Sequence, residues 1–143
     1  MDLFRALDIS ASGLSAARKR MEVIGENLAN SETTRTAAGG PYRRKTVLLQ
    51  AAEGPGFAAA LGNGAAREGG VQVAGVVESA DAPRRVHRPD HPQAGPDGFV
   101  SLPNVNPMTE MVDMLATTRA YEANATAFQA AKSMGIKLLE LLR

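Results

Sequence analysis

The prolines and glycines of this chain are concentrated in its middle, and this distribution limits the possible folds more than any other feature. All 8 prolines lie between Pro41 and Pro107, and 11 of the 14 glycines lie between Gly39 and Gly98. Both residue types interrupt helices and mark turns. The chain is therefore expected to have a long helix at each end and loops with short strands between them.

The N-terminal helix is predicted from a heptad pattern over residues 3–29. The apolar positions with this spacing, including one intermediate position, are Leu7, Leu14, Met21, Ile24 and Leu28. Heptad spacing is typical of a helix that packs against a partner helix. These side chains are therefore candidate assembly contacts.

The C-terminal helix is predicted to begin at Asn106-Pro107, because asparagine is a good N-cap and proline is favoured at the first helical position. Its candidate assembly contacts are Met111, Met114, Tyr121, Phe128, Leu139 and Leu142. Asn124, near the middle of this helix, is either a buried residue that sets the helix register or a solvated one.

The middle region contains runs that are typical of strands, at residues 42–50, 71–77 and 98–102. Residues 53–70 are rich in alanine and glycine and predict a mobile loop, and the prolines of residues 87–96 predict irregular structure. The expected fold is mainly α with a small β-rich middle region, and its long terminal helices pair as a coiled coil. The predicted segments are 1–34, 35–104 and 105–143.

Composition excludes several classes of function. The chain has 16 Lys+Arg against 15 Asp+Glu, and its basic cluster, residues 43–45, is short, so a nucleic-acid interface is not expected. Cysteine is absent, which excludes disulfides and thiolate metal sites. No apolar run approaches the ~20 residues that span a bilayer, and no signal peptide is evident. Taken alone, these features favour the cytoplasm.

The one cluster that suggests metal chemistry is His87-Arg-Pro-Asp-His91. A helical zinc motif needs two histidines one turn apart, and Pro89 prevents that helix. Ser10, Ser12 and Ser15 have no histidine close in sequence to activate them. No catalytic, cofactor-binding or metal-binding residue is predicted, and the chain is not expected to be an enzyme.

Several motifs suggest a family. The run Asn27, Leu28, Ala29, Asn30 followed by Thr33 closes the first helix and resembles the signature of the bacterial flagellar rod and hook protein family. Residues 9–14 resemble the same family. Further stretches, which resemble its proximal-rod members, occur in the same order along the chain: residues 40–45, 91–92, 97–100, 103–106, 110–114, 119–124 and 131–134.

The resemblance implies a structural subunit of the flagellar basal-body proximal rod, which transmits torque and surrounds the export channel. The implied partners are FlgB-, FlgF- and FlgG-like rod subunits, a FliE-like protein at the junction of the rod with the MS-ring, and the flagellar type III export apparatus. The implied location is the rod within the periplasm, reached without a cleaved signal peptide, which replaces the cytoplasmic inference. No cofactor is implied.

Three alternatives remain open, one within the resembled family and two outside it. One is a sister rod protein of the FlgB or FlgF type. Another is a cytoplasmic helical secretion adaptor, and the third is a small hydrolase that uses the loop from His87 to Asp97.

Overall fold

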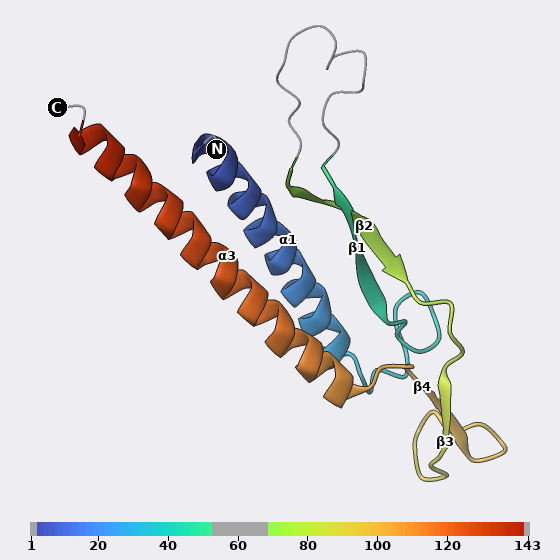
Figure 1. Cartoon of the computed structure of the whole chain (residues 1–143). Coiled ribbons are helices and arrows are strands. Elements are labelled where there is room, and N and C mark those ends of the chain that lie inside the picture. The colour runs from blue at the N-terminus through green and yellow to red at the C-terminus, as the bar shows by residue number, and fades with distance from the viewer. Residues whose placement is uncertain (1–2, 53–68, 142–143) are drawn as a thin grey trace, which may run out of the picture. The chain divides into compact units, whose positions relative to one another are not determined.

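A computed structural model describes residues 3–52 and 69–141. Within these residues the elements, drawn in Figure 1, are α1 (Leu3–Ala29), β1 (Lys45–Ala51), β2 (Val71–Glu78), β3 (Arg84–His87), β4 (Phe99–Leu102) and α3 (Pro107–Leu141). The fold is mainly helical with a small β region in the middle. Residues 53–68 of the expected mobile loop, and Leu142, lie outside the described residues.

α1 has the predicted bounds and ends at a side-chain cap. The backbone N–H and the side-chain Nδ2 of Asn30 both donate to the carbonyl of Glu26, at 3.0 and 2.9 Å. The backbone N–H of Thr33 in turn donates to the carbonyl of Asn30, at 3.1 Å. Carbonyls in the last turn of a helix need such partners, and here the chain supplies them as it leaves the helix.

α3 begins as predicted. Pro107 is its first residue, and the Oδ1 of Asn106 accepts a hydrogen bond from the backbone N–H of Met108 at 3.0 Å. This is the geometry of an N-cap, which satisfies a donor that the helix itself cannot pair.

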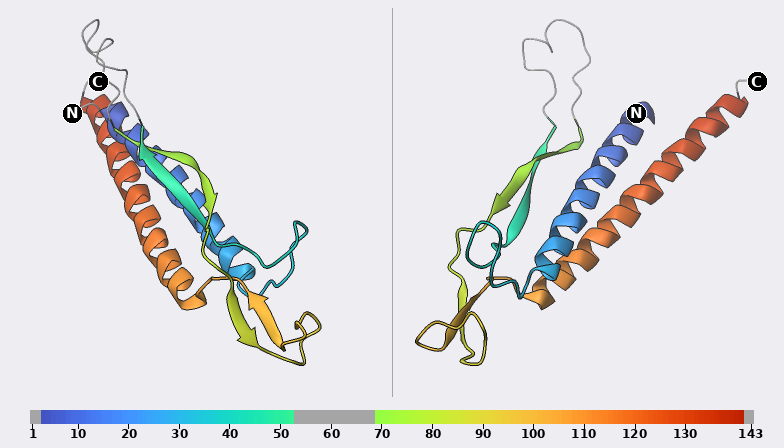
Figure 2. Two further views of the ribbon diagram at one scale, coloured as in Figure 1. Left: turned by 90° about the vertical axis from the view of Figure 1, so that its right-hand side faces the viewer. Right: turned by 180° about the vertical axis from the view of Figure 1, so that it is seen from behind.

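The three predicted strands are confirmed as β1, β2 and β4. β1 and β2 pair with each other, and β3 and β4 form a second pair; the strands are drawn from two further sides in Figure 2. The second pair is antiparallel, and its register runs from Arg84↔Leu102 to His87↔Phe99. β3 was not predicted, because Arg84-Arg85-Val86-His87 lacks an alternating apolar pattern. Its strand conformation comes from pairing with β4.

The chain divides into two compact units that cut across the elements. Unit 1 comprises Met1–Lys19, Leu48–Gly75 and Thr117–Arg143, and unit 2 comprises Arg20–Val47 and Val76–Ala116. Each long helix therefore contributes one part to each unit.

In unit 1, α1 and α3 meet through small side chains. A Cβ built on Gly13 would lie 2.9 Å from the side-chain amide atoms of Asn124, and one on Gly135 would lie 2.7 Å from Cδ2 of Leu3. The side chain of Ala131 is buried in the same unit. Residues early in α1 therefore face residues late in α3, so the two segments run antiparallel at close approach.

Unit 2 holds the larger buried side chains. Its apolar core contains Val23, Ile24, Tyr42, Val100, Leu102 and Val105. Here Gly25 of α1 faces Met114 of α3, with the Met114 Cε 3.9 Å from a Cβ built on Gly25. In the described part of the chain, no helix is both long and apolar enough to cross a membrane.

Candidate functional site

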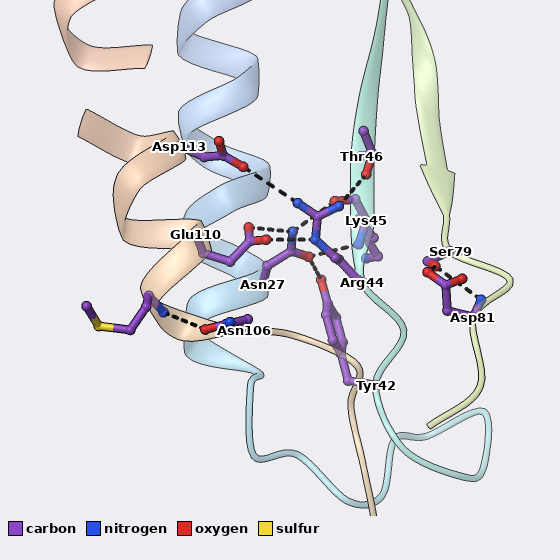
Figure 3. Close-up of polar contacts among 11 residues, drawn as sticks. Asn27, Tyr42, Arg44, Lys45, Thr46, Ser79, Asp81, Asn106, Glu110 and Asp113 are labelled. Atoms are coloured by element: carbon purple, nitrogen blue, oxygen red, sulfur yellow. Dashed lines mark hydrogen bonds and ion pairs between the residues drawn. The ribbon is translucent and has the colours of Figure 1, made fainter. Parts of the chain in front are cut away.

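Asn27 is the centre of a buried polar cluster in unit 2, in the last turns of α1. Its side chain is 1% exposed. The Oδ1 accepts from the Tyr42 hydroxyl and from the Lys45 backbone N–H, each at 2.9 Å. The Nδ2 donates to the Lys45 carbonyl at 2.8 Å and to Oε2 of Glu110 at 3.0 Å (Figure 3). All four hydrogen-bonding positions of the carboxamide are thus used.

Glu110 lies in the first turn of α3 and is 0% exposed. One carboxylate oxygen accepts from Asn27, and the other accepts from Nε of Arg44 at 2.7 Å. Arg44 also approaches Asp113, with 3.7 Å between its guanidinium and the carboxylate (Figure 3). Burying a carboxylate is costly unless it is paired and hydrogen-bonded, and Glu110 meets both conditions.

Two backbone contacts make Asn27 resemble a neighbouring strand. Its carboxamide bonds both the N–H and the C=O of Lys45, the first residue of β1. A peptide group in a β-ladder pairs with a neighbouring strand through the same two kinds of bond. Asn27 therefore fixes the start of β1 against α1 without a third strand.

Tyr42 and Lys45 complete the cluster. Burial, followed by the charges of Glu26 and Glu110, raises the pKa of Tyr42 to about 12. A hydrogen bond to Glu26 raises the pKa of Lys45, whose ammonium lies 5.6 Å from the centre of the Tyr42 ring. We call Asn27, Tyr42, Arg44, Lys45 and Glu110 the Asn27 network. Every buried side-chain N or O atom among the described residues has a hydrogen-bond partner.

The remaining residues of the Asn27–Asn30 motif shape the helix end. Asn30 caps α1, and the Thr33 hydroxyl donates to its Oδ1 at 3.1 Å. Leu28 is half-buried and Ala29 is exposed. Asn27 and Asn30 thus have different tasks: one binds β1 and α3, and the other ends the helix.

The predicted assembly contacts fall into three groups by exposure. Ile24 is buried. The half-buried group is Leu7, Leu14, Met21, Leu28, Met114 and Phe128. The exposed group is Met111 at 51%, Tyr121 at 38% and Leu139 at 70%, and Leu142 lies outside the described residues. As assembly contacts, all of them remain predictions.

The histidine loop has local contacts. The His87 ring meets Phe99 edge-on at 5.1 Å between centroids, and Nδ1 of His91 accepts from the Gln93 backbone at 3.1 Å. Asp97 forms an ion pair with Arg85. In residues 3–52 and 69–141, no group of three or more His, Cys, Asp and Glu side chains could hold a metal ion.

Asn124, for which two environments were open, is half-buried. Its Nδ2 donates to the carbonyl of Ala120 within α3 at 3.0 Å, while its side chain packs against Gly13. It is therefore neither a fully buried residue nor a freely solvated one.

Sequence reasoning noted the motifs that contain Tyr42, Arg44 and Glu110 but did not predict that they meet. Their separations from Asn27 reach 83 residues. The positions of Asn27 and Glu110 on their helices could have indicated that they are buried. Asn27 lies one turn after Val23 and Ile24, and Glu110 lies one turn before Met114. A polar residue in line with an apolar helix face is a candidate for a buried hydrogen bond.

Comparison with known proteins identifies the same segments. Residues 7–35 match the profile of the flagella basal body rod protein, and residues 97–141 match the flagellar basal body rod FlgEFG protein C-terminal profile. The first match contains Asn27 and the second contains Glu110.

Full-length relatives extend the match to the whole chain. The flagellar basal-body rod protein FlgC of Bacillus subtilis is 42% identical, over 99% of this chain and 99% of its own. FlgC of Borreliella burgdorferi is 38% identical over 100% and 99% of the two chains, and FlgC of Salmonella typhimurium is 38% identical over 99% and 98%. By its name, each of these relatives is a rod component rather than an enzyme. The chain therefore belongs to the FlgC family of flagellar basal-body rod proteins and is a structural subunit of the rod.

Proposed function

We propose that this rod subunit belongs to the proximal rod, where α1 and α3 pair as an antiparallel coiled coil around the export channel and transmit torque. Within the three predicted segments, residues 1–34 and 105–143 supply the inter-subunit contacts, and residues 35–104 face outward. The close approach of the two helices at Gly13 and Gly135 supports the antiparallel pairing.

The observation that carries this proposal is the exposed apolar surface of α3. In unit 2, one face of α3 leaves four large apolar side chains exposed: Met108 at 70%, Met111 at 51%, Val112 at 64% and Leu115 at 53%. These four positions have the i, i+3, i+4, i+7 spacing of a single helix face, and an exposed apolar helix face is typical of a protein interface. Glu110, which contacts α1, lies on the opposite side of this part of α3, so the exposed face is available to neighbouring subunits.

The proposed neighbours are FlgB-, FlgF- and FlgG-like rod subunits and a FliE-like junction protein, and the subunit reaches the periplasm through the flagellar type III export apparatus. Export through a narrow channel requires unfolding. Low stability of the isolated helices is compatible with that route, since ordering is completed by assembly.

The experiment compares Leu14→Lys and Leu28→Lys with Ser15→Lys, which places the same charge on an exposed position of α1. The leucine variants are expected to be exported but to assemble no rod, so that cells do not swim. Burying an unpaired ammonium in these contacts costs several kcal/mol, and this cost is expected to prevent assembly. Ser15→Lys is expected to swim.

Normal swimming by both leucine variants would contradict the proposed contacts. Fractionation separates the proposal from the secretion-adaptor alternative. A rod subunit is recovered in purified basal bodies, whereas an adaptor remains in the cytoplasm as a soluble dimer and is absent from them.

A further inference from the structure

The Asn27 network joins three separate parts of unit 2. Asn27 comes from the end of α1, Tyr42 to Lys45 come from the segment leading into β1, and Glu110 comes from the start of α3. Figure 3 shows the Asn27 carboxamide between the Glu110 carboxylate and the Lys45 backbone. Asn27 thus touches both of the other parts, and Glu110 in turn accepts from Asn27 and from Arg44.

We propose that Glu110 is a positioning residue that acts through Asn27: docking of the first turns of α3 orients the Asn27 carboxamide, and the oriented carboxamide holds the start of β1. The folding of residues 42–47 is thereby coupled to the docking of a helix more than 60 residues further along the chain.

The orientation argument follows from donors and acceptors. A carboxylate only accepts hydrogen bonds, so Glu110 requires the Nδ2 end of Asn27 to face it. The opposite end then faces the Tyr42 hydroxyl and the Lys45 N–H, which are donors. If the amide turned over, Nδ2 would face the Lys45 N–H and Oδ1 would face the Glu110 carboxylate, so a donor would oppose a donor and an acceptor an acceptor.

Burial makes this coupling strong. Asn27 is 1% exposed and Glu110 is 0% exposed, so water cannot readily replace a missing partner for either one. Arg44 adds a second link between the same parts, because it precedes β1 directly and its Nε donates to the other oxygen of Glu110. Release of α3 from unit 2 would therefore leave both Asn27 and Arg44 without their acceptor.

The test is amide hydrogen exchange in the full-length Glu110→Gln variant. Glutamine keeps the shape of the side chain but replaces one of the two acceptor oxygens with an NH₂ group that only donates, so it can accept from Arg44 or from Asn27 in the present geometry but not from both. The Lys45 backbone amide is expected to exchange at least tenfold faster. The Arg88 amide, which donates to the Gly98 carbonyl at the end of the β3–β4 pair, is expected to keep its rate.

The matched control is Glu122→Gln, the same chemical change at an exposed position of α3. It is expected to leave the exchange rate of the Lys45 backbone amide unchanged. Two outcomes of the Glu110→Gln experiment would overturn the proposal: an unchanged Lys45 amide, or an equal acceleration at Lys45 and Arg88, which would mean general destabilisation.

A second measurement needs no variant and holds even if Glu110→Gln does not fold. In the unmodified protein, the side-chain amide protons of Asn27 are expected to exchange at least tenfold more slowly than those of the exposed Asn104. Equal rates at the two asparagines would show that the Asn27 carboxamide is not held, and would overturn the proposal.

Discussion

The two long helices meet in different ways in the two units. In unit 1 the helices approach closely at small residues, with Gly13 against Asn124, Gly135 against Leu3, and Ala131 buried. In unit 2 the same two helices are joined by a buried hydrogen bond between Asn27 and Glu110. One pair of helices therefore uses close packing in one unit and directional polar bonding in the other.

An assembly subunit needs surfaces that can pack against neighbours, and it needs one defined internal arrangement. Apolar contacts are not directional, so a neighbouring helix can add to them or take their place. A buried polar network that is fully satisfied specifies one arrangement, because any other arrangement leaves a group unpaired. The Asn27 network therefore fixes how residues 42–45 join the two helices in unit 2, whereas the helix segments of unit 1 are held by close packing.

The largest effect is expected from Asn27→Leu, which keeps the approximate volume but removes four hydrogen bonds. The Glu110 carboxylate and the Tyr42 hydroxyl lose partners in a buried site. The free energy of unfolding should fall by about 3–5 kcal/mol, since each unsatisfied buried group costs about 1–3 kcal/mol and charged groups cost more. Urea unfolding followed by circular dichroism measures this loss.

Asn104→Leu, at an exposed position of the same unit, is the control and should change stability by less than about 0.5 kcal/mol. If Asn27→Leu unfolds at the same urea concentration as the unmodified chain, the buried polar bonds do not stabilise unit 2, and the proposed difference between the two units is wrong.

An intermediate effect is expected from alanine at Gly13. Its Cβ would lie 2.9 Å from the Asn124 side chain, so Gly13→Ala should destabilise the chain by about 1–3 kcal/mol through overpacking. Adding Asn124→Ala should restore part of the loss, because it removes the atoms that clash. Thermal unfolding of the two variants measures both effects.

Gly25→Ala is the matched comparison on the same helix. The nearest atom to its new Cβ is Met114 Cε at 3.9 Å, an ordinary contact, so the better helix propensity of alanine should stabilise the chain by about 0.5–1 kcal/mol. If the change in unfolding free energy has opposite signs at Gly13 and Gly25, the close approach of the helices is confined to unit 1. Equal changes at the two sites would contradict that assignment.

Local signals in the sequence predicted most of the fold. The heptad pattern and the Asn106-Pro107 cap gave the helices their observed starts, and β-rich runs predicted β1, β2 and β4. The strand β3 was missed because its pairing with β4, and not its own composition, makes it a strand. The Asn27 network was missed for the same kind of reason: its members come from three segments, and hydrogen bonds between distant residues leave no periodic trace.

The last effect is confined to alkaline pH and does not change stability at neutral pH. Burial, with the charges of Glu26 and Glu110, raises the pKa of Tyr42 from 10.0 to about 12. A group whose pKa is raised by folding stabilises fully below its unfolded pKa, and that contribution is lost as the pH rises through the folded pKa. The free energy of unfolding should therefore fall between pH 10 and about 12, and Tyr42→Phe should lack this part of the decline.

Tyr121→Phe, which removes the phenol of an exposed tyrosine on α3, is the matched comparison for alkaline unfolding curves. The contribution of Tyr42 is the difference between the two variants. Identical curves for the two variants would mean that the Tyr42 hydroxyl is not held in the Asn27 network.

A double-mutant cycle between Asn27 and Glu110 tests the central claim most directly. The unfolding free energies of the unmodified chain, Asn27→Ala, Glu110→Ala and the double variant give the coupling between the two side chains. Residues that share a hydrogen bond in a buried network typically couple by about 0.5–3 kcal/mol, and we predict about 1 kcal/mol or more between these two. Additive losses, with no coupling beyond experimental error, would contradict the account.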